Sequence, residues 1–207
     1  MKRRSAAMFL AILFCLTGCG GIERAKESTV TVNKEGIVTE ALIEEFLSEN
    51  YDADELEASI KELADTYNEE IGKEAVKIMK IRVKEGVATA LLQYESDDIY
   101  REFNQVDFFA GNVGQAKEEG YTFAETFQDV EGHKIASGIV PDSCTDQQVI
   151  IIREPLNVQV PGKILYVSNN MKILNNKQAK LEQDVDVIYE NTQVTTEAFG
   201  YVIYSAK

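Results

Sequence analysis

The sequence has little of the chemistry on which most enzymes depend. Its 207 residues include one histidine, three cysteines and no tryptophan. Zinc sites need several His or Cys ligands, and neither a His-Glu-x-x-His nor a Cys-x-x-Cys motif is present. A Ser or Cys nucleophile needs a base, and His133 is the only imidazole in the chain. We therefore expect no catalytic residue, no metal and no cofactor.

The apolar run near the start of the chain is too short to span a membrane. It covers residues 6–16 and follows Lys2, Arg3 and Arg4, which is the layout of an export signal. As a helix it would be about 17 Å long at ~1.5 Å per residue, whereas a bilayer core needs roughly 20 residues. Residues 1–18 are therefore predicted to be a signal peptide.

The run ends in Leu16-Thr17-Gly18-Cys19, which resembles the lipobox of bacterial lipoproteins. The resemblance implies that diacylglyceryl is attached to the Cys19 sulfur and that the Gly18–Cys19 bond is cut. Two acyl chains on one residue anchor a protein stably, whereas a single chain is marginal. Residues 19–28 would then be a lipidated tether, and the protein would lie on the extracytoplasmic face of the cell membrane. The alternative is an ordinary signal peptide followed by an unrelated cysteine.

The chain is strongly acidic, with 35 Asp and Glu against 21 Lys and Arg. Cleavage would remove three positive charges and no negative one, which takes the formal net charge from −14 to −17. Such a surface repels nucleic-acid phosphates and anionic lipid headgroups, so we expect no nucleic-acid partner and no flat contact with the membrane. High solubility explains this charge, and an acidic binding face is the alternative.

Residues 29–207 are predicted to form a single α+β domain. Alternating apolar residues favour a β-hairpin with strands at 29–32 and 37–44. A long amphipathic helix is predicted from Asp54, where an acid and a Glu three residues later are typical of a capped start, to Gly72. The apolar stripe expected to face the sheet consists of Leu56, Ile60, Leu63, Tyr67 and Ile71.

Further strands and a second helix follow. Strands are predicted at 75–83 and 87–94, with a bulge after Ile78, and a short helix is predicted from Ser96 to Phe103. The C-terminal part has short apolar runs separated by turn residues, which predicts an antiparallel meander. These runs are at 149–153, 156–160, 164–167, 171–174, 179–181, 185–189 and 200–204. The predicted fold is thus an antiparallel sheet packed against one long helix and one short helix.

Few residues are candidates for chemistry. Cys144 and His133 are the sole nucleophile and base that can be paired, although a turn-exposed histidine explains His133 as well. The segment 50–54 resembles the start of a calcium loop, but Glu55 stands where that loop needs glycine, so helix capping explains it better. Residues 105–145 are rich in glycine and aromatics and are the least periodic, which is typical of a region that forms a pocket or a packed loop.

Two functions remain open from the sequence. The first is a non-enzymatic binding or interaction module of the cell envelope, whose partner is an envelope protein or a small-molecule ligand. The second is an extracytoplasmic hydrolase that uses acidic residues, with a pocket in 105–145. The domain as a whole, with its N-terminal hairpin, acidic helix and strand-rich end, resembles uncharacterised lipoproteins of Gram-positive gut bacteria. That resemblance implies a location and no activity.

Overall fold

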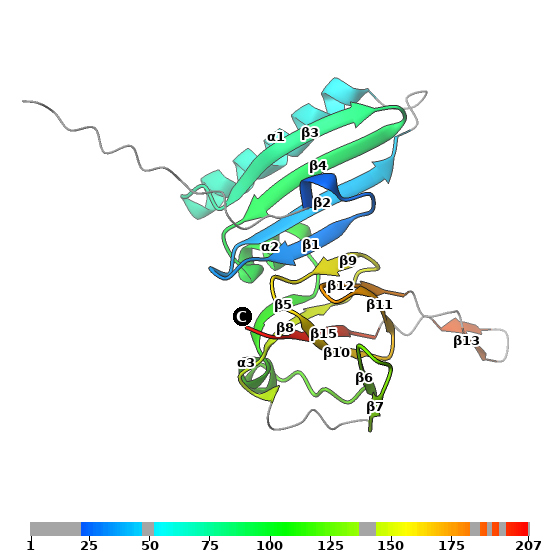
Figure 1. Cartoon of the computed structure of the whole chain (residues 1–207). Helices are drawn as coiled ribbons and strands as arrows, with labels where there is room; N and C mark the ends of the chain where they lie inside the picture. The colour runs from blue at the N-terminus through cyan, green and yellow to red at the C-terminus, as the bar shows by residue number, and fades with distance from the viewer. Residues whose placement is uncertain are drawn as a thin grey trace, which may run out of the picture.

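A computed structural model describes residues 22–46, 52–136, 144–182, 187–189, 192–194 and 198–206, the two three-residue segments by their backbone alone. Gly18 and Cys19, on which the lipoprotein prediction rests, lie outside these residues. The fold is broadly α+β, with mixed and antiparallel sheets and three α-helices in the described part (Figure 1). No helix among the described residues is long and apolar enough to cross a membrane.

The N-terminal hairpin is confirmed. Strands β1 (Thr29–Val32) and β2 (Val38–Glu45) pair antiparallel. In their turn, the side-chain carbonyl of Asn33 accepts from the backbone N–H groups of Glu35 and Ile37. Ahead of β1, the 3-10 helix η1 (Ile22–Arg24) contacts the sheet, and Ile22 is 1% exposed against Ala41 and Leu91.

The long helix α1 (Ala53–Ile71) ends at Gly72 as predicted, with this glycine in the left-handed region at φ 73°. Its predicted start at Asp54 is wrong. Asp52 is the N-cap, because its carboxylate accepts from the backbone N–H groups of Asp54 and Glu55. Leu63 is also misplaced by the prediction: it is 63% exposed, and the buried residue of this turn is Ala64.

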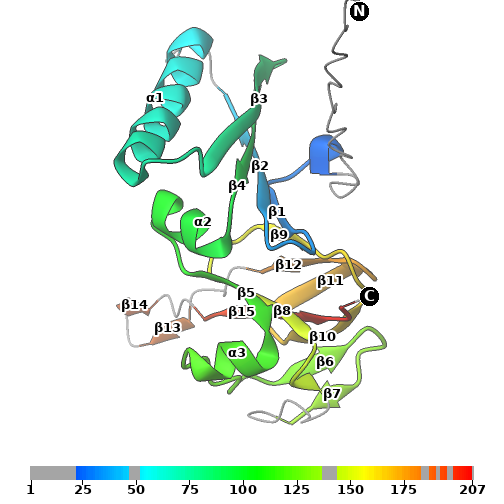
Figure 2. The same ribbon diagram turned by 90° about the vertical axis from the view of Figure 1, so that its left-hand side faces the viewer.

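Strands β3 (Val76–Lys84) and β4 (Val87–Tyr94) form the next hairpin, and the predicted bulge lies between Ile78 and Lys80. Helix α2 (Asp97–Asn104) follows, and its N-cap is Ser96, whose hydroxyl accepts from the backbone of Ile99. Both helices lie on the same side of the sheet, opposite η1 (Figure 2).

The prediction of a C-terminal meander is wrong, because strands that follow one another in the sequence, such as β8, β9 and β10, belong alternately to two different sheets. One sheet has the order β11-β12-β9-β1-β2-β4-β3, in which β1 and β9 are parallel, so the fold is not purely antiparallel. The other has the order β5-β8-β15-β10-β6-β7, and the last long strand inserts between β8 and β10. The remaining strand bounds are β9 Asn157–Gln159, β10 Ile164–Ser168, β11 Met171–Asn175, β12 Gln178–Leu181, β8 Gln148–Ile152 and β15 Gly200–Tyr204. Strands β13 (Val187–Tyr189) and β14 (Thr192–Val194) pair separately.

The region 105–145 is more regular than predicted. It contains β5 (Phe108–Asn112), α3 (Val113–Glu118), β6 (Phe127–Asp129) and β7 (Lys134–Ile135). The short α3 forms because Asn112 and Gln115 make a reciprocal capping box.

Two cores hold the structure together. The first lies between the two sheets and under α1 and α2, and the second covers the far face of the six-stranded sheet. Alternate residues of β8 contribute to each: Ile150 and Ile152 to the first, Val149 and Ile151 to the second. This strand is therefore buried on both faces, which explains its continuous apolar run.

Candidate functional site

An apolar groove lies between α1 and the sheet. Helix α1 contacts β3, the edge strand, far more than it contacts β2 or β4. The N-terminal half of the helix therefore leaves the inner face of β2 and β4 partly uncovered. The groove has a volume of about 300 Å³, at the lower end of the range for small-molecule sites.

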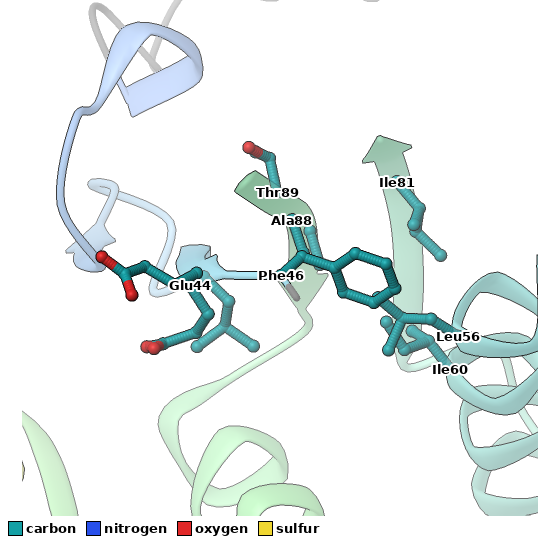
Figure 3. Close-up of a pocket in the computed structure, with 10 residues that line it drawn as sticks. Glu44, Phe46, Leu56, Ile60, Ile81, Ala88 and Thr89 are labelled. Carbon is teal, nitrogen blue, oxygen red and sulfur yellow. The ribbon is translucent and has the colours of Figure 1, made fainter. Parts of the chain in front are cut away.

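Apolar side chains from four elements line this groove. The ring of Phe46, at the end of β2, points toward Leu56 and Ile60 of α1 (Figure 3). Ile81 of β3 lies beside them, and the floor is built from small residues of β4. The complete lining is Leu42, Glu44, Glu45, Phe46, Leu56, Ile60, Ile81, Ala88, Thr89 and Ala90. Small floor residues explain why the groove is open, because larger side chains there would fill it.

Leu42 gives the groove an apolar surface that water can reach. Leu42 is 36% exposed, although it projects from the same face of β2 as the buried Glu40. Leu63 lies on the same flank of α1 as the groove residue Leu56, because seven residues make almost two helical turns. Isolated exposed leucines are ordinary, but Leu42 lines a formed cavity, whereas Leu63 lies outside its lining.

The charged residues around the groove are almost all acidic. Glu44 lies across the groove from Leu56 and Ile60 (Figure 3), and its side chain is exposed. Helix α1 adds seven acids, Asp54, Glu55, Glu57, Glu62, Asp65, Glu69 and Glu70, against one lysine. The potential at the mouth of the groove is therefore negative.

Further along the same face of the sheet, Glu40 is buried among tyrosines. It is 3% exposed, and its carboxylate accepts from the hydroxyls of Tyr94 at 2.8 Å and Tyr100 at 2.9 Å. Tyr100 also lies 3.4 Å from the carboxylate of Glu154. Burial raises the pKa of Glu40 above its usual range despite these two hydrogen bonds, and burial likewise raises the pKa of Glu154. The cluster ties β2, β4 and α2 together, and no substrate can reach Glu40.

The sequence candidates Cys144 and His133 do not form a pair. Cys144 is buried in the second core, whereas His133 is exposed in the turn between β6 and β7. His133 lies with Asp129 and Glu131 in a group whose candidate metal-ligand atoms are within 4.8 Å of one another. The turn itself explains this group, because the Asp129 carboxylate accepts from the backbone of Glu131 and His133 and contacts the imidazole Nδ1 at 2.9 Å. These backbone contacts lower the pKa of Asp129.

The region 105–145 contributes to a second, polar concavity of about 420 Å³. Its acids come from α2 and the end of α3. Asp97 accepts from the backbone of Ala110, and Asp98 pairs with Arg101, so two of these carboxylates already have partners. The full lining is Asp97, Asp98, Phe109, Ala110, Gln115, Glu118 and Glu119, with no histidine or cysteine.

No family model matches this chain, and no match was found among curated proteins or solved structures. The site must therefore be judged on its own geometry. Sequence reasoning missed the groove, because its residues come from four elements, and assigning each of these as strand or helix does not show that they enclose a cavity. The available signal was Leu42 between two glutamates on one face of β2, which is unusual for a strand face covered by a helix.

Proposed function

We propose that this chain is a lipid-anchored, non-enzymatic binding module of the cell envelope, held at Cys19 on the extracytoplasmic face of the cell membrane. The observation that supports binding most directly is the apolar groove between α1 and the sheet. It is open to solvent, and apolar side chains line it. Burial of an apolar group there would release water from Leu42, at roughly 25 cal/mol per Å² of surface covered.

The ligand is an apolar group that carries a positive charge. The groove supplies the apolar contact, while Glu44 and the acids of α1 favour a cation at its mouth. An anionic amphiphile of the same length would make the same apolar contacts but would be repelled by these acids. The ligand is therefore an amphipathic small molecule or the cationic, apolar end of an envelope component.

A binding role fits the chemistry of the groove better than hydrolysis. The lining holds no histidine, cysteine or amide side chain, and its two acids are next to each other in sequence on β2. Neighbouring residues of a strand point to opposite faces, so Glu44 and Glu45 are not placed as an acid and base pair. In the polar concavity beside α2, two of the four carboxylates, those of Asp97 and Asp98, already have hydrogen-bond or ion-pair partners.

The groove can be tested with two octyl amphiphiles below their micelle concentrations. Calorimetric titration is expected to show binding of octyltrimethylammonium at least several-fold tighter than that of octyl sulfate. Leu42→Asp should abolish the binding, because it places a charge in the apolar floor. Val130→Asp is the matched control, because Val130 is 50% exposed and lies in the turn after β6, outside the groove lining. Equal binding of both amphiphiles, or equal loss in both variants, would contradict the proposed ligand.

The anchor needs a separate measurement, the intact mass of the protein from the membrane fraction of an expressing bacterium. The expected mass is that of residues 19–207 plus diacylglyceryl, and the membrane-bound form should disappear with Cys19→Ala. Recovery of an unlipidated chain from the medium would instead favour a freely secreted binding protein.

A further inference from the structure

Strand β3 is a basic element in an acidic protein. Its nine residues include four cations, Lys77, Lys80, Arg82 and Lys84, and no acid. The chain as a whole carries a formal net charge of −14. On the other side of the same sheet, α1 has seven acids and one lysine. The two charges are therefore separated across the sheet rather than mixed over the surface.

The register of the sheet assigns the cations to its outer face, away from α1. Lys80 is paired with Leu91, and Arg82 with Thr89. Residues paired in an antiparallel ladder project to the same face. Leu91 packs against Ile22 of η1, whereas the α1 side of the sheet is built from other residues of β4. Figure 2 shows η1 and α1 on opposite sides of these strands.

Two of these cations have no ion-pair partner within the described residues. Lys77 pairs with Glu74 and Lys84 with Glu85, both close in sequence. Lys80 and Arg82 make no salt bridge to any described residue, and both are exposed. They lie two residues apart on one face of the strand, so their positions are spaced about 6.6 Å along it.

The proposed anchor would bring this face to the bilayer. Ile22 is buried against the outer face of the sheet, and Cys19 precedes it by three residues. Three residues reach at most about 11 Å at ~3.6 Å each. A lipid on Cys19 therefore holds the outer face within about one Debye length of the headgroups at 0.1 M salt. Arg24 and Lys26, beside Ile22, are exposed as well.

We propose that the outer face of β3, through Lys80 and Arg82, contacts anionic phospholipid headgroups and orients the protein on its membrane. This inference rests on the proposed anchor for its geometry. The net charge alone predicts repulsion, but the seven acids of α1 lie on the opposite side of the sheet and would face away from the bilayer. The same orientation leaves the groove beside α1 open to the envelope space, where a ligand can enter.

The test uses residues 19–207 with Cys19→Ala, which contain every described element and cannot be lipidated. The measurement is cosedimentation with vesicles of phosphatidylcholine containing 30% phosphatidylglycerol, and with phosphatidylcholine alone, at low salt. Binding is expected only to the anionic vesicles and should weaken as salt rises. Lys80→Ala with Arg82→Ala should reduce the partition coefficient about 25-fold, since each cation near an anionic surface contributes roughly fivefold.

The matched control is Lys117→Ala with Lys163→Ala, which changes the net charge equally at two exposed lysines outside the seven-stranded sheet. It should bind as the parent does. Equal loss in both double variants would show a net-charge effect and overturn the inference, as would the absence of binding to anionic vesicles. Because the Cys19→Ala chain carries no lipid, the result of the vesicle test does not depend on the result of the intact-mass test. A failed anchor and a failed membrane-facing surface are therefore distinguishable.

Discussion

The two large sheets differ in how completely their faces are covered. The six-stranded sheet is buried on both sides at its centre, where every residue of β15 and four of the five of β8 are inaccessible to water. The seven-stranded sheet is covered unevenly: η1 occupies part of its outer face, and α1 occupies one edge of its inner face. The central strands of the closed sheet expose almost no surface to a partner, whereas the open sheet has an apolar groove on one side and a row of cations on the other.

The difference follows from how each sheet meets its neighbours. Side chains of β8 and β15 alternate between two cores, so each residue is packed whichever face it occupies. The hairpin of β3 and β4 extends beyond the region between the sheets, and the main element packed on it is α1. Only one residue of this helix, Ala64, is buried. Stability is therefore concentrated in the C-terminal half, and accessible surface in the N-terminal half.

The largest expected effect is a loss of stability in the closed sheet. Ile150→Ala in β8 removes a side chain that is 0% exposed and should lower the free energy of unfolding by about 3 kcal/mol. Leu63→Ala on α1 removes a leucine that is 63% exposed and should change it by less than about 0.5 kcal/mol. Chemical denaturation of both variants beside the parent measures the two differences. Similar losses for both would contradict the division of the molecule into a closed and an open half.

The open half is also the part that the sequence predicted best. In strands and helices with one buried face, apolar residues recur at a regular spacing in the sequence. The hairpin at residues 29–45, the helix ending at Gly72 and the bulge after Ile78 could therefore be located closely. Strands buried on both faces carry no period, and their continuous apolar runs indicate strand without indicating its neighbour. The insertion of β15 between β8 and β10 depends on contacts between residues far apart in the sequence, such as Val202 with Ile150 and with Val167, which no local pattern records.

The groove was not predictable for a related reason. Correct assignment of β2, α1 and β4 does not say how far across the sheet the helix lies, and the groove exists because α1 sits over the edge strand. Leu63 shows the same limit, since its spacing fits the inward stripe but the helix is turned toward Ala64. Glu40 was not singled out either, because a glutamate in an alternating strand is expected to face water.

A smaller effect is expected at Glu40, where the open sheet has its one deeply buried carboxyl among the described residues. Burial raises its pKa in the folded protein, so the folded state binds the proton more tightly than the unfolded state does. The resulting stability is fully present below the ordinary glutamate pKa and is lost as the pH rises through the raised value. Glu40→Gln has no such titration, so its free energy of unfolding should fall less than that of the parent as the pH rises above the ordinary glutamate pKa of about 4.3.

Urea denaturation at several pH values, with the variant and the parent compared at each, isolates this contribution from the titration of the many surface acids. Glu44→Gln is the matched control for replacing a carboxyl by an amide, because Glu44 is exposed on the same strand and face. Parallel curves for the parent and Glu40→Gln would mean that the two tyrosine hydrogen bonds compensate fully for burial of the charge. If the variant instead becomes increasingly more stable than the parent as the pH rises, the buried Glu40 carboxylate lowers the stability of the folded protein. The same side chain nevertheless joins β2, β4 and α2 through its hydrogen bonds.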